Sequence, residues 1–401
     1  KQSNKSTAIM SLILTRSPFL VSNNGFEPNA SLTVDVEDII NSSGDTNVLK
    51  TYNLNFRRQS EIDISQLIYS DISDRKRSAR IKTTVRGTIP GQQTSTVVIN
   101  VYVATRGYFF FQEGYNYNAE DYLVDNVYYT GSTDCIYKLD DEDLQISLLL
   151  PKTSTDSLDD TPVDVLFLDN GNIVKSENIT LSAGNNSFVA NINSQSRLYD
   201  NFEQRTVEDG GIYEGNVCND EFFDEYSVDF FDSIRLVDQS SGNFKDIKVV
   251  NIEECKYKPI KLRFINRFGV EEDLWFFKRS QKSMDVSKEV YRGSIINSYK
   301  PSIFPVLPDD STATHLYRQF NINSRESMVL NSGYVPEEFY NSFKQLLLSE
   351  FVWAYLDDKA NNRTPVNIKS TNLVEKLHRN EKLINYEIEI EFAFDTIGNI
   401  V

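Results

Sequence analysis

The chain is poor in the residues that most often build catalytic and metal centres. It has two histidines, three cysteines and two tryptophans among 401 residues. His315 and His378 lack zinc-ligand spacing with the scattered cysteines, so we interpret them as surface or hydrogen-bonded residues. The odd number of distant cysteines, from Cys135 to Cys255, predicts no disulfide framework and favours a reducing, cytosolic folding environment.

Other absences narrow the class of protein. No nucleotide-binding loop, dinucleotide fingerprint, nucleophile elbow or HExxH motif occurs. The acidic runs Asp140–Asp143, Asp159–Asp160 and Asp220–Glu225 are more typical of solvated loops than of a glycosidase pair or a calcium loop. We therefore expect no catalytic residue, no cofactor and no bound metal. No apolar run is long enough for a membrane span, and Ile9–Leu14 is interpreted as a strand rather than a signal peptide.

Positive charge is also scarce. Fifty-eight acidic residues against 41 basic ones give a net charge of −17. Sequence-independent nucleic-acid binding needs a basic face, so we expect no direct contact with nucleic acid. The group Arg75, Lys76, Arg77 and Arg80 is interpreted as a solvated turn. This acidity is typical of a soluble subunit whose copies repel one another and associate only where their surfaces are complementary in shape.

Short β-strands, by contrast, are abundant. Their period-2 alternation, punctuated by Gly, Asn, Ser and Pro, predicts a mainly β fold of multidomain immunoglobulin-like β-sandwiches with a smaller α+β C-terminal region. The 25 Phe and 21 Tyr residues supply cores and contact surfaces. We expect an N-terminal sandwich over 1–106, an aromatic linker or arm over 107–140, a second sandwich with an insertion over 141–298, and the α+β region over 299–401.

The N-terminal sandwich should contain six short strands. They are predicted over Ala8–Leu14, Phe19–Ser22, Leu32–Val36, Tyr52–Phe56, Ile81–Val85 and Val97–Val103. Along the last strand, Val97, Ile99, Val101 and Val103 should face one side, and Val98, Asn100 and Tyr102 the other. A helical turn is predicted over Asp63–Ile72.

Two hairpins are predicted in the middle of the chain. In residues 255–277, Lys261, Arg263 and Arg267 alternate with apolar residues, a turn follows at Asn266–Gly269, and Leu274–Phe277 returns. Four aromatic residues of this hairpin should be largely buried, namely Phe264, Phe268, Trp275 and Phe276. A weaker echo over 163–174 has its turn at Asp169–Gly171.

The C-terminal region mixes both kinds of element. Helical spacing predicts a helix over Val335–Leu348 with Pro336 at its first position. Phe351–Leu356 and Pro365–Ile368 should form paired strands around a loop over 357–363. From Tyr386 to Phe394, apolar residues alternate with Glu387, Glu389 and Glu391, which predicts a strand with one buried and one anionic face.

The aromatic segment over 107–139 has no clean periodicity. It is interpreted either as a loop packed on its own domain or as an arm that docks on a neighbouring subunit. Subunit contacts are expected at residues 107–130, at the loop 357–363 and at the strand 384–397, taken as a sheet edge. The candidate interface residues are Tyr108, Phe109, Phe110, Phe111, Tyr115, Tyr117, Tyr386 and Phe392.

Three regions of the chain resemble structural proteins of tailed bacteriophages, especially those that infect Bacteroidetes-type hosts. The first comprises Ser17–Val36 and Thr51–Ile68, and the second is the hairpin over Cys255–Phe277. The third comprises Leu346–Leu356, Pro365–Asn372 and Ile384–Ile397. Together they cover about half of the chain, and none is a strict motif from which a site residue can be transferred.

The resemblance implies a non-enzymatic structural subunit of the virion, in the tail or baseplate, that is folded and assembled in the host cytoplasm. Its partners would be copies of itself in a ring or other symmetric assembly, and other virion proteins. The alternative is a surface-binding adhesin or carbohydrate-binding β-sandwich protein. Such proteins commonly present tryptophan, whereas Trp275 and Trp353 lie in apolar runs that favour a core position. A third interpretation, a polysaccharide-cleaving enzyme, is supported only by the large number of acidic residues.

Overall fold

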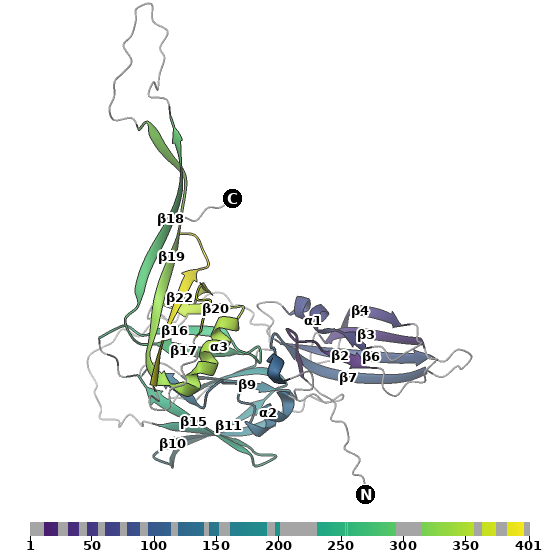
Figure 1. Cartoon of the computed structure of the whole chain (residues 1–401). Helices are drawn as coiled ribbons and strands as arrows, with labels where there is room; N and C mark the ends of the chain where they lie inside the picture. The colour runs from purple at the N-terminus through teal and green to yellow at the C-terminus, as the bar shows by residue number, and fades with distance from the viewer. Residues whose placement is uncertain are drawn as a thin grey trace, which may run out of the picture. The chain divides into compact units, whose positions relative to one another are not determined.

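The protein is mainly β, as predicted. The computed structural model describes residues 12–22, 31–39, 46–54, 61–72, 78–88, 95–113, 119–139, 144–151, 161–190, 197–200, 231–252, 254, 256–293, 315–356, 363–373 and 383–396 (Figure 1). The chain divides into two compact units. Unit 1 comprises Lys1–Glu253, Arg263–Leu274 and Glu338–Glu350, and unit 2 comprises Glu254–Leu262, Trp275–Glu337 and Phe351–Val401.

The first part of unit 1 is a five-stranded sheet in the order β1-β7-β6-β3-β4. Its strands are β1 (Leu12–Leu14), β3 (Ser31–Ile39), β4 (Thr46–Leu54), β6 (Ser78–Thr88) and β7 (Ser95–Thr105). β1 pairs in parallel with β7, and the other pairs are antiparallel. A two-stranded sheet of β2 (Leu20–Ser22) and β5 (Glu61–Asp63) accompanies it. Six strands are thus confirmed near their predicted positions, while the immunoglobulin-like topology stays a prediction.

A helix closes the core of this first sheet. α1 (Ser65–Asp71) confirms the predicted helical turn, and Asp63 Oδ1 accepts a hydrogen bond from the Ser65 N–H at its start (2.9 Å). Ile64, Ile68 and Ile72 recur every fourth residue and are fully buried with strand residues such as Val36 and Ile81. The four-residue spacing therefore places one apolar helix side on the sheet.

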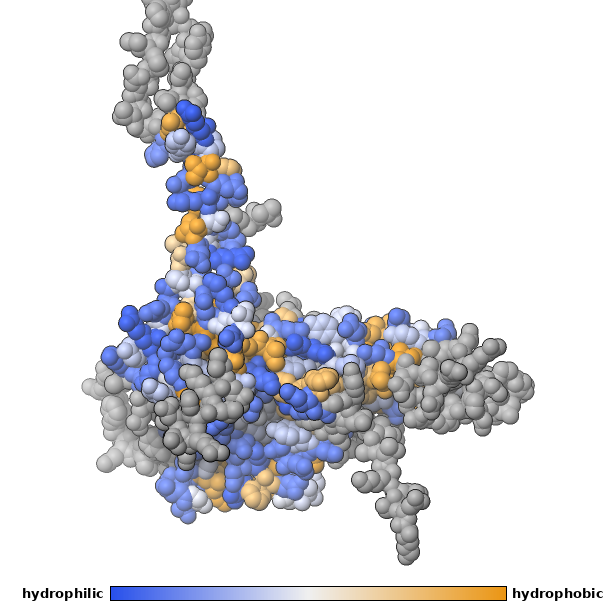
Figure 2. Space-filling view, in the orientation of Figure 1, coloured by the Kyte–Doolittle hydropathy of each residue, from blue (hydrophilic) through white to orange (hydrophobic). Residues whose placement is uncertain are grey.

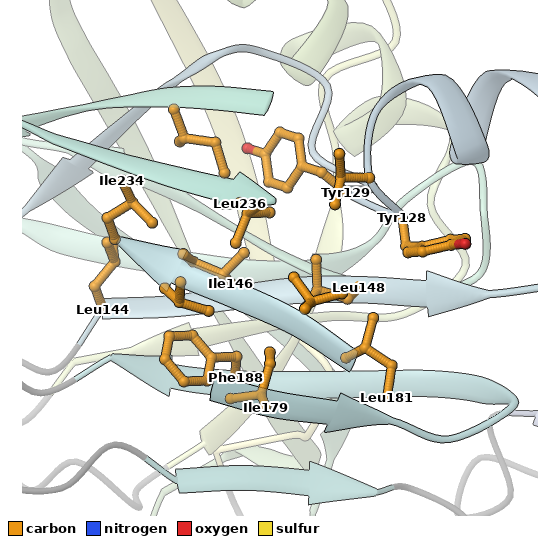
Figure 3. Packing of buried hydrophobic residues seen from close by; sticks show 14 of the residues in the cluster. Tyr128, Tyr129, Leu144, Ile146, Leu148, Ile179, Leu181, Phe188, Ile234 and Leu236 are labelled. Atoms are coloured by element: carbon orange, nitrogen blue, oxygen red, sulfur yellow. The ribbon is translucent and has the colours of Figure 1, made fainter. Parts of the chain in front are cut away.

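Two further sheets of unit 1 enclose a second core. One has the order β11-β10-β14-β15-β8 and the other the order β13-β12-β9. The strands are β8 (Cys135–Lys138), β9 (Leu144–Leu150), β10 (Thr161–Asp169), β11 (Asn172–Leu181), β12 (Gly184–Ala190), β13 (Arg197–Asp200), β14 (Ser233–Asp238) and β15 (Phe244–Asn251). Side chains from both sheets, such as Leu148, Phe188 and Leu236, form one buried cluster (Figure 3). This arrangement is sandwich-like.

Both predicted hairpins are confirmed. β10 and β11 pair across Asn170 and Gly171, whose φ values of 49° and 81° match the left-handed conformation that a two-residue hairpin turn requires. The other hairpin consists of β16 (Ile260–Ile265) and β17 (Glu271–Phe276). All four of its aromatic residues are buried, as predicted, with Trp275 at 7% exposure.

The largest sheet has seven strands in the order β17-β16-β20-β21-β22-β19-β18. The remaining strands are β18 (Gln281–Arg292), β19 (Tyr317–Pro336), β20 (Val352–Tyr355), β21 (Arg363–Ile368) and β22 (Leu383–Phe392). β20 pairs with β21 as predicted. In β22, Ile384, Tyr386, Ile388 and Ile390 are buried while Glu387 is exposed, which confirms the amphipathic strand.

The C-terminal helix begins later than predicted. β19 continues to Pro336, a 3-10 turn η2 spans Glu337–Phe339, and α3 spans Tyr340–Leu348. Pro336 still pairs with Leu383 of β22, so the strand ladder overrides the helical preference at this position. The apolar spacing was correct, because Phe339, Phe343 and Leu346 are buried.

Several local predictions are wrong. β22 lies between β19 and β21, so it is not a sheet edge. The alternation predicted along β7 is not among them, because β7 pairs with β6 without a register shift, although Val97, Val98 and Ile99 at its start are all exposed. Arg80 is buried within β6 rather than solvated in a turn. Helix was expected mainly over 335–348, with a helical turn over 63–72, but it also occurs in α2 (Ala119–Asp125) and in the 3-10 turn η1 (Phe111–Glu113).

Candidate interaction surfaces

The aromatic segment turns most of its predicted interface residues toward its own unit. Tyr108 is 8% exposed, its N–H donates to the Arg267 carbonyl oxygen (2.7 Å), and its ring packs edge-on against Phe110 (5.6 Å). Burial raises the pKa of Tyr108 to about 12, although Arg16 and Arg267 act in the opposite direction. The part over 107–110 is therefore a segment packed on unit 1.

Phe110 and Phe111 have different environments. The Lys344 ammonium lies 3.9 Å from the centre of the Phe110 ring, and the Arg267 guanidinium lies 5.2 Å from it. Glu113 holds this arrangement, because it accepts from the Phe110 N–H (2.8 Å) and forms an ion pair with Arg267 (2.9 Å). Phe111, in contrast, is 92% exposed. Within the described residues 107–113, it is the aromatic side chain most available to a partner.

The other candidate interface residues vary in accessibility. Phe109 is partly buried, and Tyr115 and Tyr117 lie outside the described residues, as does most of the loop 357–363. Tyr386 is buried, at 5% exposure. Phe392 is partly buried, with the Lys282 ammonium 5.2 Å from its ring centre. Contacts between subunits through these residues stay a prediction.

A buried polar cluster fixes the tip of the β16–β17 hairpin within unit 1. The Asn266 side chain accepts from the N–H groups of Phe268 (3.0 Å) and Val270 (3.2 Å) and donates to the Thr130 carbonyl oxygen (2.9 Å). Gln345 Oε1 of α3 accepts from the Arg267 N–H (2.9 Å). These bonds satisfy the polar groups of the turn, so the cluster rigidifies the hairpin tip.

Glu272 is the ionisable member of this cluster. Its carboxylate accepts from the Ser132 N–H (3.3 Å), from the Ser132 hydroxyl and from the Asn266 amide (3.2 Å). The Ser132 and Ser342 hydroxyl oxygens lie 2.5 Å apart. Burial raises the pKa of Glu272, and these hydrogen bonds only partly offset that rise. A carboxylate bound to hydroxyl and amide donors is suited to holding three segments together.

We expect Glu272→Gln to remove a loss of folding stability that depends on pH. A carboxyl group whose pKa is higher in the folded than in the unfolded state binds its proton more tightly when folded, so folding loses stability as pH rises. This loss of stability is absent at pH values below 4.5, the usual pKa of a glutamate, and it is complete at pH values above the raised pKa of the folded state. The free energy of unfolding of the variant, minus that of the parent, should therefore rise with pH in urea titrations.

Glu254→Gln provides a control of opposite sign. Hydrogen bonding to Lys278 lowers the pKa of Glu254, so its favourable contribution is present at higher pH and is lost as pH falls through the folded pKa. The same difference should therefore fall with rising pH for this variant. A difference that is independent of pH for Glu272→Gln would contradict the prediction.

The most exposed regular element is a two-stranded ribbon in unit 2. We define the ribbon as β18 together with residues 317–328 of β19, and its strands extend beyond the remainder of their sheet in Figure 1. All 12 residues of β18 are exposed. At about 3.3 Å per residue this strand is about 40 Å long. β18 has β19 on one edge, and no described strand pairs with the other.

The two faces of the ribbon differ in chemistry. Alternation along β18 gives one face to Lys282, Met284, Val286, Lys288, Val290 and Arg292, and the antiparallel register adds Tyr317 opposite Arg292. We call these seven residues the apolar–basic face. The other face carries hydroxyl and charged groups, including the Ser283–Ser327 hydroxyl pair (2.8 Å), and one aromatic pair, Tyr291 with Phe320 (5.5 Å).

The apolar–basic face continues the buried side of the sheet into solvent. Met328, opposite Lys282, and Leu330 are buried where β19 also pairs with β22. Further along, Met284 is 54% and Val290 54% exposed. Figure 2 shows apolar and hydrophilic residues side by side along the ribbon. This surface was not predicted from the sequence, although the alternation in KSMDVSKEVYR (residues 282–292) was a usable signal. The predicted domain boundary at 298/299 falls between β18 and β19, which pair with each other.

Metal and membrane features complete the description. Among the described residues, no group of three or more His, Cys, Asp or Glu side chains could hold a metal ion. None of the helices in the described ranges has the length and apolar character needed to cross a membrane. No protein-family model and no curated protein matches the chain.

Proposed function

We propose that the chain is a non-enzymatic structural subunit of a tailed-phage virion, in the tail or baseplate, which acts through symmetric protein–protein contacts. The observation that supports this proposal is the exposed ribbon. Two strands alone are marginally stable in water, and apolar side chains on such strands gain about 25 cal/mol for each Å² that a partner covers. Covering the ribbon would therefore stabilise both the ribbon and the assembly.

The resemblance of three regions to tailed-phage structural proteins supports the virion as the place of this assembly. Like-charge repulsion from a net charge of −17 would limit premature association of free subunits. Symmetry would then add many modest interfaces, so each contact could be weak in isolation.

Cryo-electron microscopy of purified particles that contain this chain tests the proposal. We expect several copies related by symmetry, with the ribbon in contact with neighbouring protein. A single copy without symmetry mates, or turnover of a defined substrate by the purified protein, would contradict it.

A glycan array tests the adhesin or carbohydrate-binding alternative. Trp275 is buried and offers no ring to a sugar, whereas Trp353 is partly buried and stacks on Phe351 (6.2 Å between ring centres). Specific glycan binding that is lost in Trp353→Ala would favour the alternative over the structural role.

A further inference from the structure

We propose that the outer part of the ribbon, residues 288–292 on its apolar–basic face, binds an acidic surface on unit 2 of a second copy of this chain. We define the acidic surface as five carboxylates on the other side of the same sheet, namely Asp285, Glu387, Glu389, Glu391 and Asp395. The inference rests on the proposed function, because it names the surface that covers the ribbon.

The strand register gathers these carboxylates on one side of the sheet. Glu391 of β22 lies opposite Ser327 of β19, which in turn lies opposite Ser283 of β18. Opposite residues share a face, and Ser283 lies on the face of the ribbon that is opposite to the apolar–basic face. Alternation along β22 adds Glu387 and Glu389 on the side of Glu391. These residues therefore form one surface.

Lys369 connects two carboxylates of the acidic surface. Its ammonium lies 2.9 Å from the carboxylate of Glu389 and 3.7 Å from that of Asp285. The side chains of Lys369, Glu389 and Asp285 are open to solvent, with exposed fractions of 43%, 40% and 76%. One cation shared between two carboxylates leaves one negative charge uncompensated.

Arg325 has the same role for a second pair of carboxylates. Its guanidinium lies 2.9 Å from Asp395 and 3.8 Å from Glu391. Glu387 is exposed, accepts a hydrogen bond from the Asn331 amide (3.0 Å) and forms no ion pair with another described residue. Five carboxylates and the two cations paired with them give a net charge of −3, so positive charge on a partner is favoured here.

The outer part of the ribbon carries positive charge with a matching spacing. Lys288 and Arg292 are exposed and form no ion pair with another described residue. They are four residues apart, which is about 13 Å along a strand, and Glu387 and Glu391 have the same separation on β22. The two basic groups can therefore face two carboxylates when the strands run side by side.

Apolar side chains lie between the charges on both surfaces. Val290 lies between Lys288 and Arg292 and is 54% exposed. Val329 of β19 is partly buried and lies opposite Glu389. Protection of a sheet edge explains basic residues on β18, but it does not explain an exposed valine between them. A partner surface that is both acidic and apolar explains both.

Contact between two ribbons is disfavoured by the same charges. Packing of two apolar–basic faces on each other would bring Lys288 and Arg292 of both copies together. Antiparallel pairing of two β18 edges about a two-fold axis would do the same, because even-numbered residues would lie opposite even-numbered ones. Like charges at an interface are repulsive, so the acidic surface is the better partner.

The size of the ribbon indicates that one such contact is weak. A two-stranded face about 40 Å long and about 10 Å wide buries at most about 800 Å² over both partners, below the lower limit of about 1,200 Å² for stable interfaces. The two surfaces lie on opposite faces of one sheet, so the contact is heterologous. Each copy can bind one neighbour through its ribbon and another through its acidic surface, which gives rings or open chains.

Charge reversal on each surface tests the inference by sedimentation velocity of the full chain, over a range of concentrations at one fixed ionic strength. Lys288→Glu/Arg292→Glu, the ribbon variant, lowers the net charge by four, from −17 to −21. Glu387→Lys/Glu391→Lys, the surface variant, raises it by four, from −17 to −13. We expect each variant to weaken self-association by about tenfold or more. General repulsion predicts the opposite for the surface variant, because its net charge is smaller.

Combining the two reversals provides the control. The variant with all four substitutions has the net charge of the parent, −17, and again has opposite charges on the two surfaces, so its self-association should recover. An equimolar mixture of the ribbon variant and the surface variant should also associate, since each ribbon meets a surface of opposite charge on the other variant. Circular dichroism of each variant separates loss of contact from loss of folding. Stronger association of the surface variant, or no recovery in the mixture, would overturn the inference.

Cross-linking of the parent chain tests the geometry without any substitution. Carbodiimide joins amines directly to carboxylates, and a mixture of isotopically labelled and unlabelled chains identifies links between copies. Lys288 of one copy should be joined to Glu387, Glu389 or Glu391 of another. Links between copies that join Lys288 only to other carboxylates would contradict the proposed contact.

These outcomes are separable from failure of the proposed function. A parent chain that stays monomeric at its highest soluble concentration and gives no links between copies overturns the inference alone, when particles show symmetric copies in contact through other surfaces. Copies that associate through the ribbon in solution but occur singly in particles overturn the proposed function alone. Failure of both measurements overturns both.

Discussion

Replacing Arg263 by methionine should lower the free energy of unfolding by about 3–5 kcal/mol. Arg263 is buried and forms a bidentate pair with Asp273, with both N–O distances at 2.6 Å. Its guanidinium also lies 3.6 Å from the carboxylate of Glu271, which is buried too. Methionine keeps much of the apolar stem, so the expected loss reports mainly on two carboxylates left without their cation.

Arg235→Met is the matched control. Arg235 and Asp246 form the same kind of bidentate pair, at 2.6 and 2.9 Å, but both side chains are well exposed. Water can solvate the remaining carboxylate, so this substitution should cost less than about 1 kcal/mol. Urea unfolding followed by far-ultraviolet circular dichroism gives both values.

Similar small losses for Arg263→Met and Arg235→Met would mean that burial does not strengthen the pair. That result would contradict the expected loss of about 3–5 kcal/mol for Arg263→Met.

Trp275→Ala should cost about 3–5 kcal/mol, because it opens a cavity in a packed region. Trp275 is 7% exposed, and the Lys261 ammonium lies 5.2 Å from its ring. The same ammonium lies 4.8 Å from the ring of Tyr355, so removing the indole also disturbs a cation shared by two aromatic rings.

The second tryptophan of the chain serves as the control for the first. Trp353 is only partly buried, and its main aromatic contact is the stacked ring of Phe351. Trp353→Ala should therefore cost about 1 kcal/mol. Circular dichroism is the better probe here, since each substitution removes one of the two tryptophans on which fluorescence would report. Equal costs for the two variants would contradict the core assignment of Trp275.

The sequence predicted best those elements whose pattern is local. Asn170–Gly171 and Asn266–Gly269 predicted turns because Asn and Gly adopt the positive φ values that tight turns require. The strand around Tyr386 was predicted from its alternation, and every second residue of it is buried. α2 was missed because its seven residues lie in an aromatic segment without helical spacing. The burial of Arg263 depends on Asp273, ten residues away, so alternation alone assigned it to a polar face.

The candidate contact surface was harder to predict for a physical reason. The ribbon has no covered face within the described chain, so hydrophobic alternation along β18 does not distinguish a core strand from an exposed one. Aromatic richness instead drew attention to the segment around Tyr108, which fills space within unit 1. Only pairing between β18 and β19 shows that the alternating residues share one exposed face.

The interleaving of the two units has a consequence for biosynthesis. Unit 1 needs Glu338–Glu350 in addition to Lys1–Glu253, so no single cut separates the two units. At ribosomal rates of about 5–20 residues per second, roughly 5–20 s pass between synthesis of residue 253 and of residue 350. During this interval α3 has not yet been synthesised, so the side of the β16–β17 hairpin tip that α3 contacts stays uncovered in the nascent chain. A pause in translation or a bound chaperone at this stage would therefore affect the folding of unit 1, which is complete only after residue 350 has been synthesised.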